Sequence, residues 1–231
     1  MSKAVSNEKT IVQKIATRCN AIDRIMQGGV SVGEVTELCG ENATGIMPHI
    51  LQSPINQIDN PCDHITTKQV ESPHELPDVL DWVVKLIKYS HNTCRHIRLV
   101  VIDSIASICA SHFENTVEGL DSRTQLLRAI GYGLHSIAST YNVAVIVVNN
   151  VVDVFPSDRD SSTNFMMSSG RKVRPALGKG WTRNIATRLF LSKALNPVTQ
   201  TSDRLCSVLL SPTLELDACR FKITEKGVRD E

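Results

Sequence analysis

Apolar residues follow two different periods along this chain. Nearly continuous apolar runs over 97–104 and 143–150 predict strands, and the run over 97–104 is typical of a strand buried on both faces of a parallel sheet. A further strand is predicted over 32–39, leading into a glycine-containing loop. Apolar residues at helical spacing predict two long helices, one beginning at Ser72 and one over 123–140. Because strands alternate with helices, the chain is expected to form an α/β domain with a mostly parallel sheet.

The start of the first long helix carries its own signal. Ser72 and Glu75 have the spacing of a capping box, and Pro73 suits a first helical turn. In both helices, apolar residues recur on the face that should pack inward. They are Leu76, Val79, Leu80, Val83, Val84 and Ile87 in the first helix, and Leu126, Leu127, Ile130, Leu134 and Ile137 in the second.

Glycines complicate this pattern in two places. A short helix is predicted over 20–27, with Asn20 as its cap and Gly28-Gly29 as its end. Within the second long helix, Gly131 and Gly133 are weak helix formers and count against the assignment.

The last third of the chain has a different pattern. Residues 155–180 are rich in Ser, Asp, Pro and Gly, which predicts a long loop with a functional role or disorder. The segments 186–193, 204–211 and 219–224 predict an antiparallel strand meander at the sheet edge, and 225–228 supply a turn.

Composition narrows the class of protein. The chain has 231 residues, of which 42% are hydrophobic and 21% charged, so it can bury a full core and global disorder is not expected. We expect a flexible extension over 1–16 and one core domain over 17–231. The seven cysteines are scattered without a C-x-x-C pair, which favours reduced thiols and an intracellular, soluble protein. No apolar run reaches the length of a membrane helix.

A glycine frame follows the first predicted strand. Gly40 and Gly45 fit G-x-x-x-x-G, whose backbone N–H groups cradle phosphates at a helix N-terminus. The motif should continue with Lys and then Ser or Thr, but Ile46 and Met47 stand there. Asp103 ends the second strand, where a carboxylate could hold the water shell of Mg²⁺. The alternative is a buried acid that caps the turn that follows.

The interval between the glycine frame and Asp103 is short. A strand–helix–strand unit takes about 30 residues or more. Pro54 would break a helix after the glycine frame, and Pro61 follows soon afterwards. The chain is therefore expected to lack one helix–strand unit near 46–61.

Positive charge gathers in one window of a chain whose net charge is only +1. No Asp or Glu occurs between Ser161 and Ser202, which predicts a surface that faces nucleic-acid phosphates. The alternative is a solvated charge run in which Arg188 and Lys193 guard an edge strand. Trp181 could stack on a base or pack against the sheet. The basic residues are Arg171, Lys172, Arg174, Lys179, Arg183, Arg188 and Lys193.

Several stretches together resemble the core of the eukaryotic RecA-family recombinases. They are CNAIDRIMQGGVSVGEVTELCGENATG, LVVIDSIAS, the 123–150 segment ending near VNNV, and RPALGKGWTRNIATRLFLSK. The PALGxxW element at 175–181 and the ending LSP…CRFKITEKGV favour a recombinase paralogue over the recombinase itself. The resemblance covers roughly 17–45 and 62–229.

This resemblance implies a RecA-like P-loop ATPase core that binds ATP and Mg²⁺ and acts in homologous recombination, in the repair of double-strand breaks and crosslinks. The implied partners are single-stranded or junction DNA, a sister paralogue of the C-type and the recombinase itself, in the nucleus and also the cytoplasm. No membrane partner is implied. The implied cofactor residues are Gly40, Glu41, Asn42, Ala43, Thr44, Gly45, Asp103 on the Mg²⁺ side, and Asn150 in place of a nucleotide-sensing Gln; the DNA residues are Arg171, Lys172, Arg174, Lys179 and Arg183.

The chain also departs from the family pattern. The phosphate-loop Lys and Ser/Thr are replaced by Ile46 and Met47, and the strand that carries the family's catalytic Glu has no match. Three hypotheses follow. The chain is a weakly catalytic or non-catalytic repair subunit, a competent DNA-dependent ATPase with a non-standard phosphate loop, or a shortened splice or gene-model product.

Overall fold

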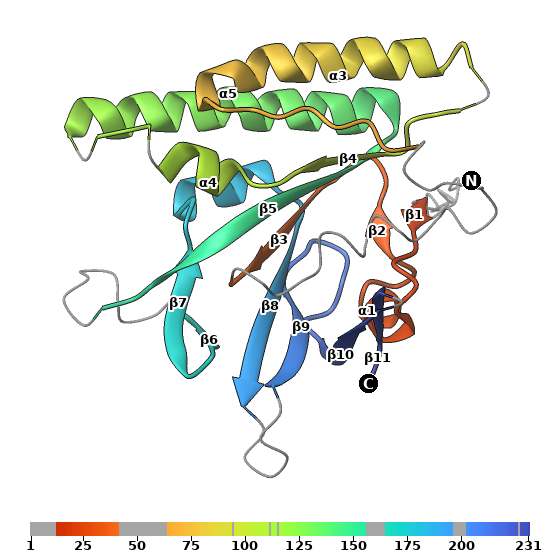
Figure 1. The fold of residues 1–231 in the computed structure, drawn as a ribbon, viewed down its shortest axis with the longest axis vertical. Coiled ribbons are helices and arrows are strands. Elements are labelled where there is room, and N and C mark those ends of the chain that lie inside the picture. The colour runs from red at the N-terminus through yellow and green to blue at the C-terminus, as the bar shows by residue number, and fades with distance from the viewer. Residues whose placement is uncertain are drawn as a thin grey trace, which may run out of the picture.

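The computed structural model describes residues 13–41, 64–93, 95–110, 112–114, 116–155, 165–195, 202–225 and 227–231. Within these residues the chain forms a nine-stranded mixed sheet and a separate two-stranded pair, with helices on the sheet's faces (Figure 1). The prediction of an α/β core with a mostly parallel centre and antiparallel C-terminal strands is confirmed.

Four parallel strands form the centre of the sheet. Their order is β4–β5–β3–β8, and β3 pairs with both β5 and β8. Apolar and β-branched residues fill these strands because a central strand is covered on both faces. The bounds are β3 Val35–Gly40, β4 Leu99–Ile102, β5 Ala144–Asp153 and β8 Thr187–Leu195.

Antiparallel strands extend the sheet at two places. The predicted meander is confirmed beside β8, and a fourth strand, β11, adds to it. A hairpin, β6–β7, pairs with the last residues of β5. The bounds are β6 Met166–Ser168, β7 Arg171–Pro175, β9 Ser202–Leu210, β10 Ala218–Thr224 and β11 Gly227–Asp230, and the separate pair is β1 Lys14–Ile15 with β2 Val30–Ser31. The pair thus includes two residues of the expected extension over 1–16.

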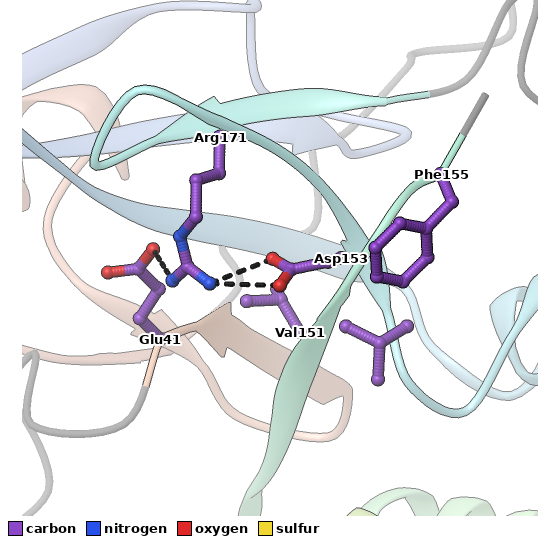
Figure 2. A pocket seen from close by; sticks show the side chains of 6 residues that line it. Glu41, Val151, Asp153, Phe155 and Arg171 are labelled. Atoms are coloured by element: carbon purple, nitrogen blue, oxygen red, sulfur yellow. Dashed lines mark hydrogen bonds and ion pairs between the residues drawn. The ribbon is translucent and has the colours of Figure 1, made fainter.

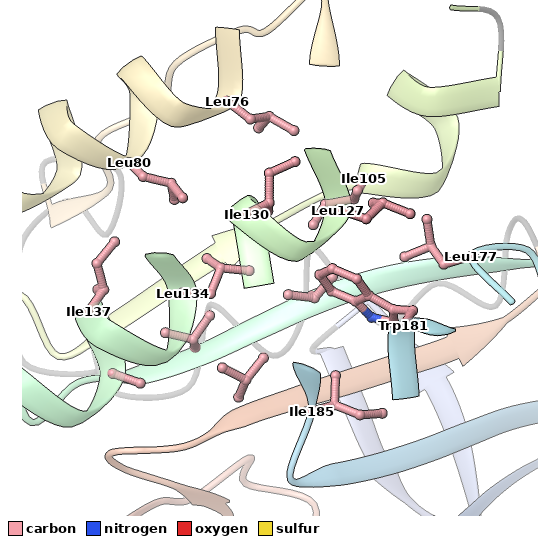
Figure 3. Close-up of a cluster of buried hydrophobic side chains, with 14 of the residues drawn as sticks. Leu76, Leu80, Ile105, Leu127, Ile130, Leu134, Ile137, Leu177, Trp181 and Ile185 are labelled. Carbon is pink, nitrogen blue, oxygen red and sulfur yellow. The ribbon is translucent and has the colours of Figure 1, made fainter. Parts of the chain in front are cut away.

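Two long helices cover one face of the sheet, α3 (Leu76–Ser90) and α5 (Val117–Tyr141), and lie side by side in Figure 1. The capping box is present: the Ser72 hydroxyl and the Glu75 carboxylate each accept a backbone hydrogen bond at the start of the 3-10 turn η2 (Pro73–Glu75). Apart from Val79, the predicted inward residues pack together with Trp181 in one core (Figure 3). Short helices α4 (Ile105–Ala110) and η3 (Lys179–Asn184) complete this layer.

The glycines within α5 have a packing role. A Cβ at Gly131 would collide with the side chain of Asn184 in η3, and one at Gly133 would lie 2.7 Å from Cδ1 of Leu80 in α3. The two glycines therefore let η3 and α3 approach the helix closely, which offsets their low helix propensity.

A second core lies under α1 (Asn20–Ile25) and the strand meander. The prediction that Asn20 caps α1 is wrong. Asn20 lies inside the helix, and Cys19 at the cap position makes no capping bond. The carboxylate of Asp230, on β11, accepts hydrogen bonds from the Ala21 backbone and the Asn20 amide, both at 2.8 Å. The cap therefore comes from the far end of the chain, which helical periodicity does not reveal.

Two further predictions are corrected. The strand within 97–104 is only half-buried, because β4 pairs with β5 alone among the described residues and its other edge carries no described strand. The segment 155–180 is not one long loop, since it contains β6, β7 and the start of η3. Ser169 and Gly170, with φ of 49° and 74°, form the two-residue turn between β6 and β7.

None of the helices in the described part of the chain is long and apolar enough to cross a membrane.

Candidate functional site: the carboxyl ends of the parallel strands

Three of the candidate nucleotide residues meet at one edge of the sheet. Gly40 ends β3 and lies opposite Asn150 of β5, and β4 runs parallel to β5 and leads directly into Asp103. Since parallel strands end at the same edge, these residues converge at the place where α/β proteins bind ligands. Asn42, Ala43, Thr44 and Gly45 lie outside the described residues, as do Ile46 and Met47.

The Asn150 side chain joins β5 to the turn after β4. Its amide oxygen accepts a hydrogen bond from the Ser104 hydroxyl at 3.1 Å, and its amide nitrogen donates to the Ser107 hydroxyl at 3.2 Å. The Ser104 and Ser107 hydroxyl oxygens lie 2.8 Å apart, within hydrogen-bond distance of each other. The neighbouring Asp103 carboxyl is exposed, and partial desolvation raises its pKa above the usual value. A polar rim of hydroxyls, amide and carboxylate therefore stands at the strand ends.

Beneath this rim lies a buried ion pair. Glu37 of β3 is fully buried and accepts hydrogen bonds from Asn149 of β5, at 2.7 Å, and from the guanidinium of Arg188 on β8. The Asn149 oxygen in turn accepts a bond from the Leu177 backbone at 3.3 Å. These contacts tie the PALG element to three central strands. Arg188 therefore neutralises a core carboxylate and does not guard an edge, because β8 lies between β3 and β9.

The β6–β7 hairpin crosses the end of β3. On one side β7 pairs with β5, and on the other Ser169 donates its backbone N–H to Lys193 of β8 at 2.7 Å. Directly after β3, Glu41 accepts a hydrogen bond from the Ser169 hydroxyl at 2.7 Å. The basic window and the start of the phosphate loop are thus in contact.

Arg171 holds this contact with two ion pairs, drawn in Figure 2. Its guanidinium lies 2.9 Å from a Glu41 carboxylate oxygen and 2.9 Å from one of Asp153. Burial alone would raise the pKa of Glu41, but hydrogen bonds from Ser169 and Arg171 outweigh it and the pKa is lowered. Because two carboxylates compensate its charge, Arg171 adds less positive charge to the surface than the basic window in the sequence predicts.

An aromatic and apolar patch borders the same hairpin, and sequence reasoning missed it. Phe155 and Phe165 are 60% and 37% exposed, and the Lys172 ammonium lies 4.3 Å from the Phe165 ring centroid. A hollow of about 470 Å³ is lined by Glu41, Val151, Val152, Asp153, Phe155 and Arg171 (Figure 2). The signal available in the sequence was Phe165 close to Lys172 within the acid-free window 161–202.

The remaining basic residues lie in different surroundings. Arg174 of β7 is half-buried, while Lys179 and Arg183 are exposed on η3, next to α5. Trp181 is 1% exposed and packs in the core of Figure 3, so packing rather than base stacking accounts for it. The predicted DNA surface therefore divides into a hairpin group and an η3 group.

Comparison with known sequences decides the family. A sequence model of the Rad51 family matches residues 80–231, more than half of the chain. The chain belongs to the Rad51 family. The expected resemblance to RecA-type recombinases and their paralogues is confirmed.

Three relatives of this Rad51-family chain are DNA repair proteins. The XRCC3 homolog of Arabidopsis thaliana is 24% identical over 282 residues, covering 94% of this chain and 92% of the relative. The protein rhp57 of Schizosaccharomyces pombe is 26% identical, covering 96% and 81%, and RAD51 homolog B of Zea mays is 26% identical, covering 94% and 69%. The alignment with the XRCC3 homolog is longer than the 231 residues of this chain, so that relative has residues without a counterpart here.

Rad51-family proteins generally use ATP and Mg²⁺, and the site fits this pair only in part. Asp103 and Asn150 lie close together, since Asp103 follows β4, Asn150 is on the adjacent parallel strand β5, and Ser104 donates to the Asn150 amide oxygen. On the phosphate side, the positions after Gly45 carry no cation and no hydroxyl. Glu41 is held by Arg171, so its negative charge is compensated at the loop's start.

Proposed function

We propose that this chain is a DNA-binding subunit of recombinational DNA repair, acting at double-strand breaks and crosslinks, with little or no ATP hydrolysis of its own. Membership of the Rad51 family and the repair roles of its relatives support the process. The observation that carries DNA binding is the surface around the β6–β7 hairpin, where the Lys172 ammonium lies over the exposed Phe165 ring and the exposed Phe155 lines a hollow with Glu41.

The chemistry of this hairpin suits a single strand of nucleic acid. An ammonium can contact a phosphate, and exposed rings can stack on unpaired bases of any sequence. Junction DNA, which also exposes unpaired bases, is the second substrate to compare.

The test is binding of a labelled single-stranded oligonucleotide, followed by fluorescence anisotropy over a range of salt. Phe165→Ala is expected to weaken binding about tenfold, within the range measured for one stacked base. Lys172→Met is expected to lower the slope of log K against log salt by about one. Lys88→Met, an exposed lysine on α3, is the matched control and should change neither value. Wild-type binding that does not depend on salt, or equal loss in all three variants, would rule out this surface.

We also propose that ATP hydrolysis is impaired, because Ile46 and Met47 supply neither the charge nor the metal hydroxyl that the family loop uses. If nucleotide binds, Asp103 would hold the Mg²⁺ water shell and Asn150 would lie beside it. Titration with a fluorescent ATP analogue, with Asp103→Ala as the control, distinguishes an impaired subunit from a competent ATPase. Tight binding that Asp103→Ala abolishes, together with DNA-stimulated turnover, would establish the competent ATPase instead.

The chain is proposed to act in the nucleus within a complex that contains a sister paralogue of the C-type and, through it, the recombinase. Co-purification of the chain with that paralogue tests this assembly. The absence of any complex, together with a transcript that encodes the missing helix, strand and Lys–Thr pair, would favour a shortened product. An intact 25.5 kDa protein in cells that unfolds cooperatively would count against that product.

A further inference from the structure

Two cysteines face each other across the C-terminal strand meander. Cys206 of β9 and Cys219 of β10 are direct cross-strand partners, and they are 1% and 5% exposed. Both side chains belong to the core under α1. Because directly opposed residues of a strand pair point to the same face of the sheet, the two thiols are neighbours within this core.

The register also brings their backbones to the right separation. The Val208 N–H donates to the Asp217 carbonyl at 2.9 Å, so this opposed pair is of the hydrogen-bonded type. Pair types alternate along an antiparallel ladder, which makes Cys206–Cys219, two positions further on, the same type with Cα atoms about 5.5 Å apart. Disulfides form across Cα separations of roughly 4.4–6.8 Å. The Cα separation lies within this range, whereas the Cβ atoms of such a pair are about 5.5 Å apart, so the two strands must close by about 1 Å for the bond to form.

The two thiols differ in chemical character. A hydrogen bond with Cys206 lowers the pKa of Cys219 against the effect of burial, and the nearby Arg24 acts in the same direction. The same bond, together with burial, raises the pKa of Cys206. Cys219 is also the less deeply buried of the two, 5% against 1% exposed, so we take it as the thiol that peroxide reaches first and Cys206 as the thiol that resolves it.

We propose that Cys206 and Cys219 form a reversible disulfide on exposure to hydrogen peroxide, so that this strand pair is a redox modification site. The Cys219 thiolate attacks one peroxide oxygen, the O–O bond breaks, and hydroxide leaves, giving a sulfenic acid. The Cys206 thiol then loses its proton and attacks the Cys219 sulfur, forming the S–S bond and releasing water. A cellular dithiol reduces the bond by thiol–disulfide exchange. This site is independent of the proposed DNA surface and of nucleotide.

Other buried thiols provide an internal comparison. Cys39 lies opposite Asn149 and Phe190 on its neighbouring strands, and burial raises its pKa to about 12. Burial also raises the pKa of Cys109. Neither has the cross-strand thiol partner that Cys219 has, so both should stay reduced under the same treatment.

Tryptic mapping of the full chain tests the proposal directly. Arg204 and Arg220 bound one peptide, 205–220, that carries both cysteines. After mild peroxide treatment of the folded protein, followed by alkylation in denaturant, this peptide should be unalkylated and lighter by two hydrogen atoms. Dithiothreitol should restore double alkylation, while the peptides with Cys39 and Cys109 should be alkylated throughout.

Two comparisons make the result decisive. Cys206→Ser should leave a sulfenic acid at Cys219 that dimedone captures, whereas Cys109→Ser should still form the disulfide. The wild-type chain should form it faster when folded than in urea. Three results would overturn the proposal. The 205–220 peptide could remain doubly alkylated, Cys219 could be oxidised to sulfinic acid while Cys206 stays free, or the disulfide could form at equal rates in the folded and the urea-unfolded chain.

Discussion

At the scale of single residues, Glu37 illustrates why residue type and burial must be considered together. A carboxylate on a central strand is costly to bury, and here Arg188 and Asn149 compensate it. The sequence placed Arg188 in a basic window that suggested solvent or DNA. Its partner in the structure is Glu37, which lies 151 positions away in the sequence and on the neighbouring strand β3.

Removing one member of the Glu37–Arg188 pair should strongly destabilise the fold. Arg188→Met is expected to lower the free energy of unfolding by about 3–5 kcal/mol, because it leaves a buried charge without a partner. The double variant Glu37→Gln/Arg188→Met removes the charge, keeps an oxygen for Asn149 and should recover much of that loss. Chemical denaturation measures both. Arg183→Met, at an exposed position, is the control, and an equal loss there would show that the pair has no special role.

Asp230 gives a prediction about pH. Hydrogen bonds from the Ala21 backbone, the largest effect, and from Cys19 and Asn20 lower the pKa of this carboxyl in the folded chain. Its stabilising effect is therefore present above the pKa of the unfolded chain, about 3.9, and is lost as the pH falls through the lower folded value. Asp230→Asn should be less stable than wild type at pH 7 and the difference should shrink below about pH 4. A difference that stays constant down to pH 2 would contradict the cap.

At the scale of elements, helix α5 depends on contacts that its own sequence does not favour. Gly131 and Gly133 weaken the helix, yet α5 extends from Val117 to Tyr141 because η3 and α3 pack against those positions. Helix α5 is stabilised by tertiary packing in the core that contains Trp181 and the predicted inward leucines and isoleucines.

The two glycines should respond differently to alanine. Gly131→Ala is expected to destabilise the fold by about 1–3 kcal/mol, since the short Asn184 side chain cannot move aside and the strain exceeds the gain in helix propensity. Gly133→Ala meets only the far end of flexible Leu80 and should cost much less. Thermal unfolding of both variants provides the measurement. Equal effects would mean that helix propensity, not the η3 contact, dominates.

At the scale of the whole molecule, strand β4 is the edge of the described sheet beside the candidate site. The alignment with the Arabidopsis thaliana XRCC3 homolog contains residues with no counterpart in this chain. The short interval between Gly45 and Asp103 predicts that one helix–strand unit is missing near 46–61, and this stays a prediction.

Restoring that unit is the corresponding test. A chimaera that carries the relative's segment after Gly45, including its Lys and Ser/Thr, is expected to bind a fluorescent ATP analogue more tightly than this chain does. The same chimaera with the inserted Lys changed to Ala is the control. If neither protein gains nucleotide affinity, the shortened interval is not what limits the site.

The sequence alone determined the elements that depend on local periodicity and local chemistry. The strand at 143–150, the helix capped by Ser72, the α/β class and the C-terminal meander all follow from near-neighbour patterns. Strands β3, β4 and β5 pair in parallel in the structure, so that Gly40, Asp103 and Asn150 lie at one sheet edge.

Only the tertiary structure decided which charges face each other and which strands have neighbours. Arg171 binds Glu41 and Asp153, Asp230 caps a helix more than two hundred positions earlier, and Cys206 meets Cys219 through strand register. These pairings arise from sheet order and from the position of the β6–β7 hairpin across the end of β3. Periodicity carries no information about such long-range partners, since it records which face a residue occupies and not what lies against that face.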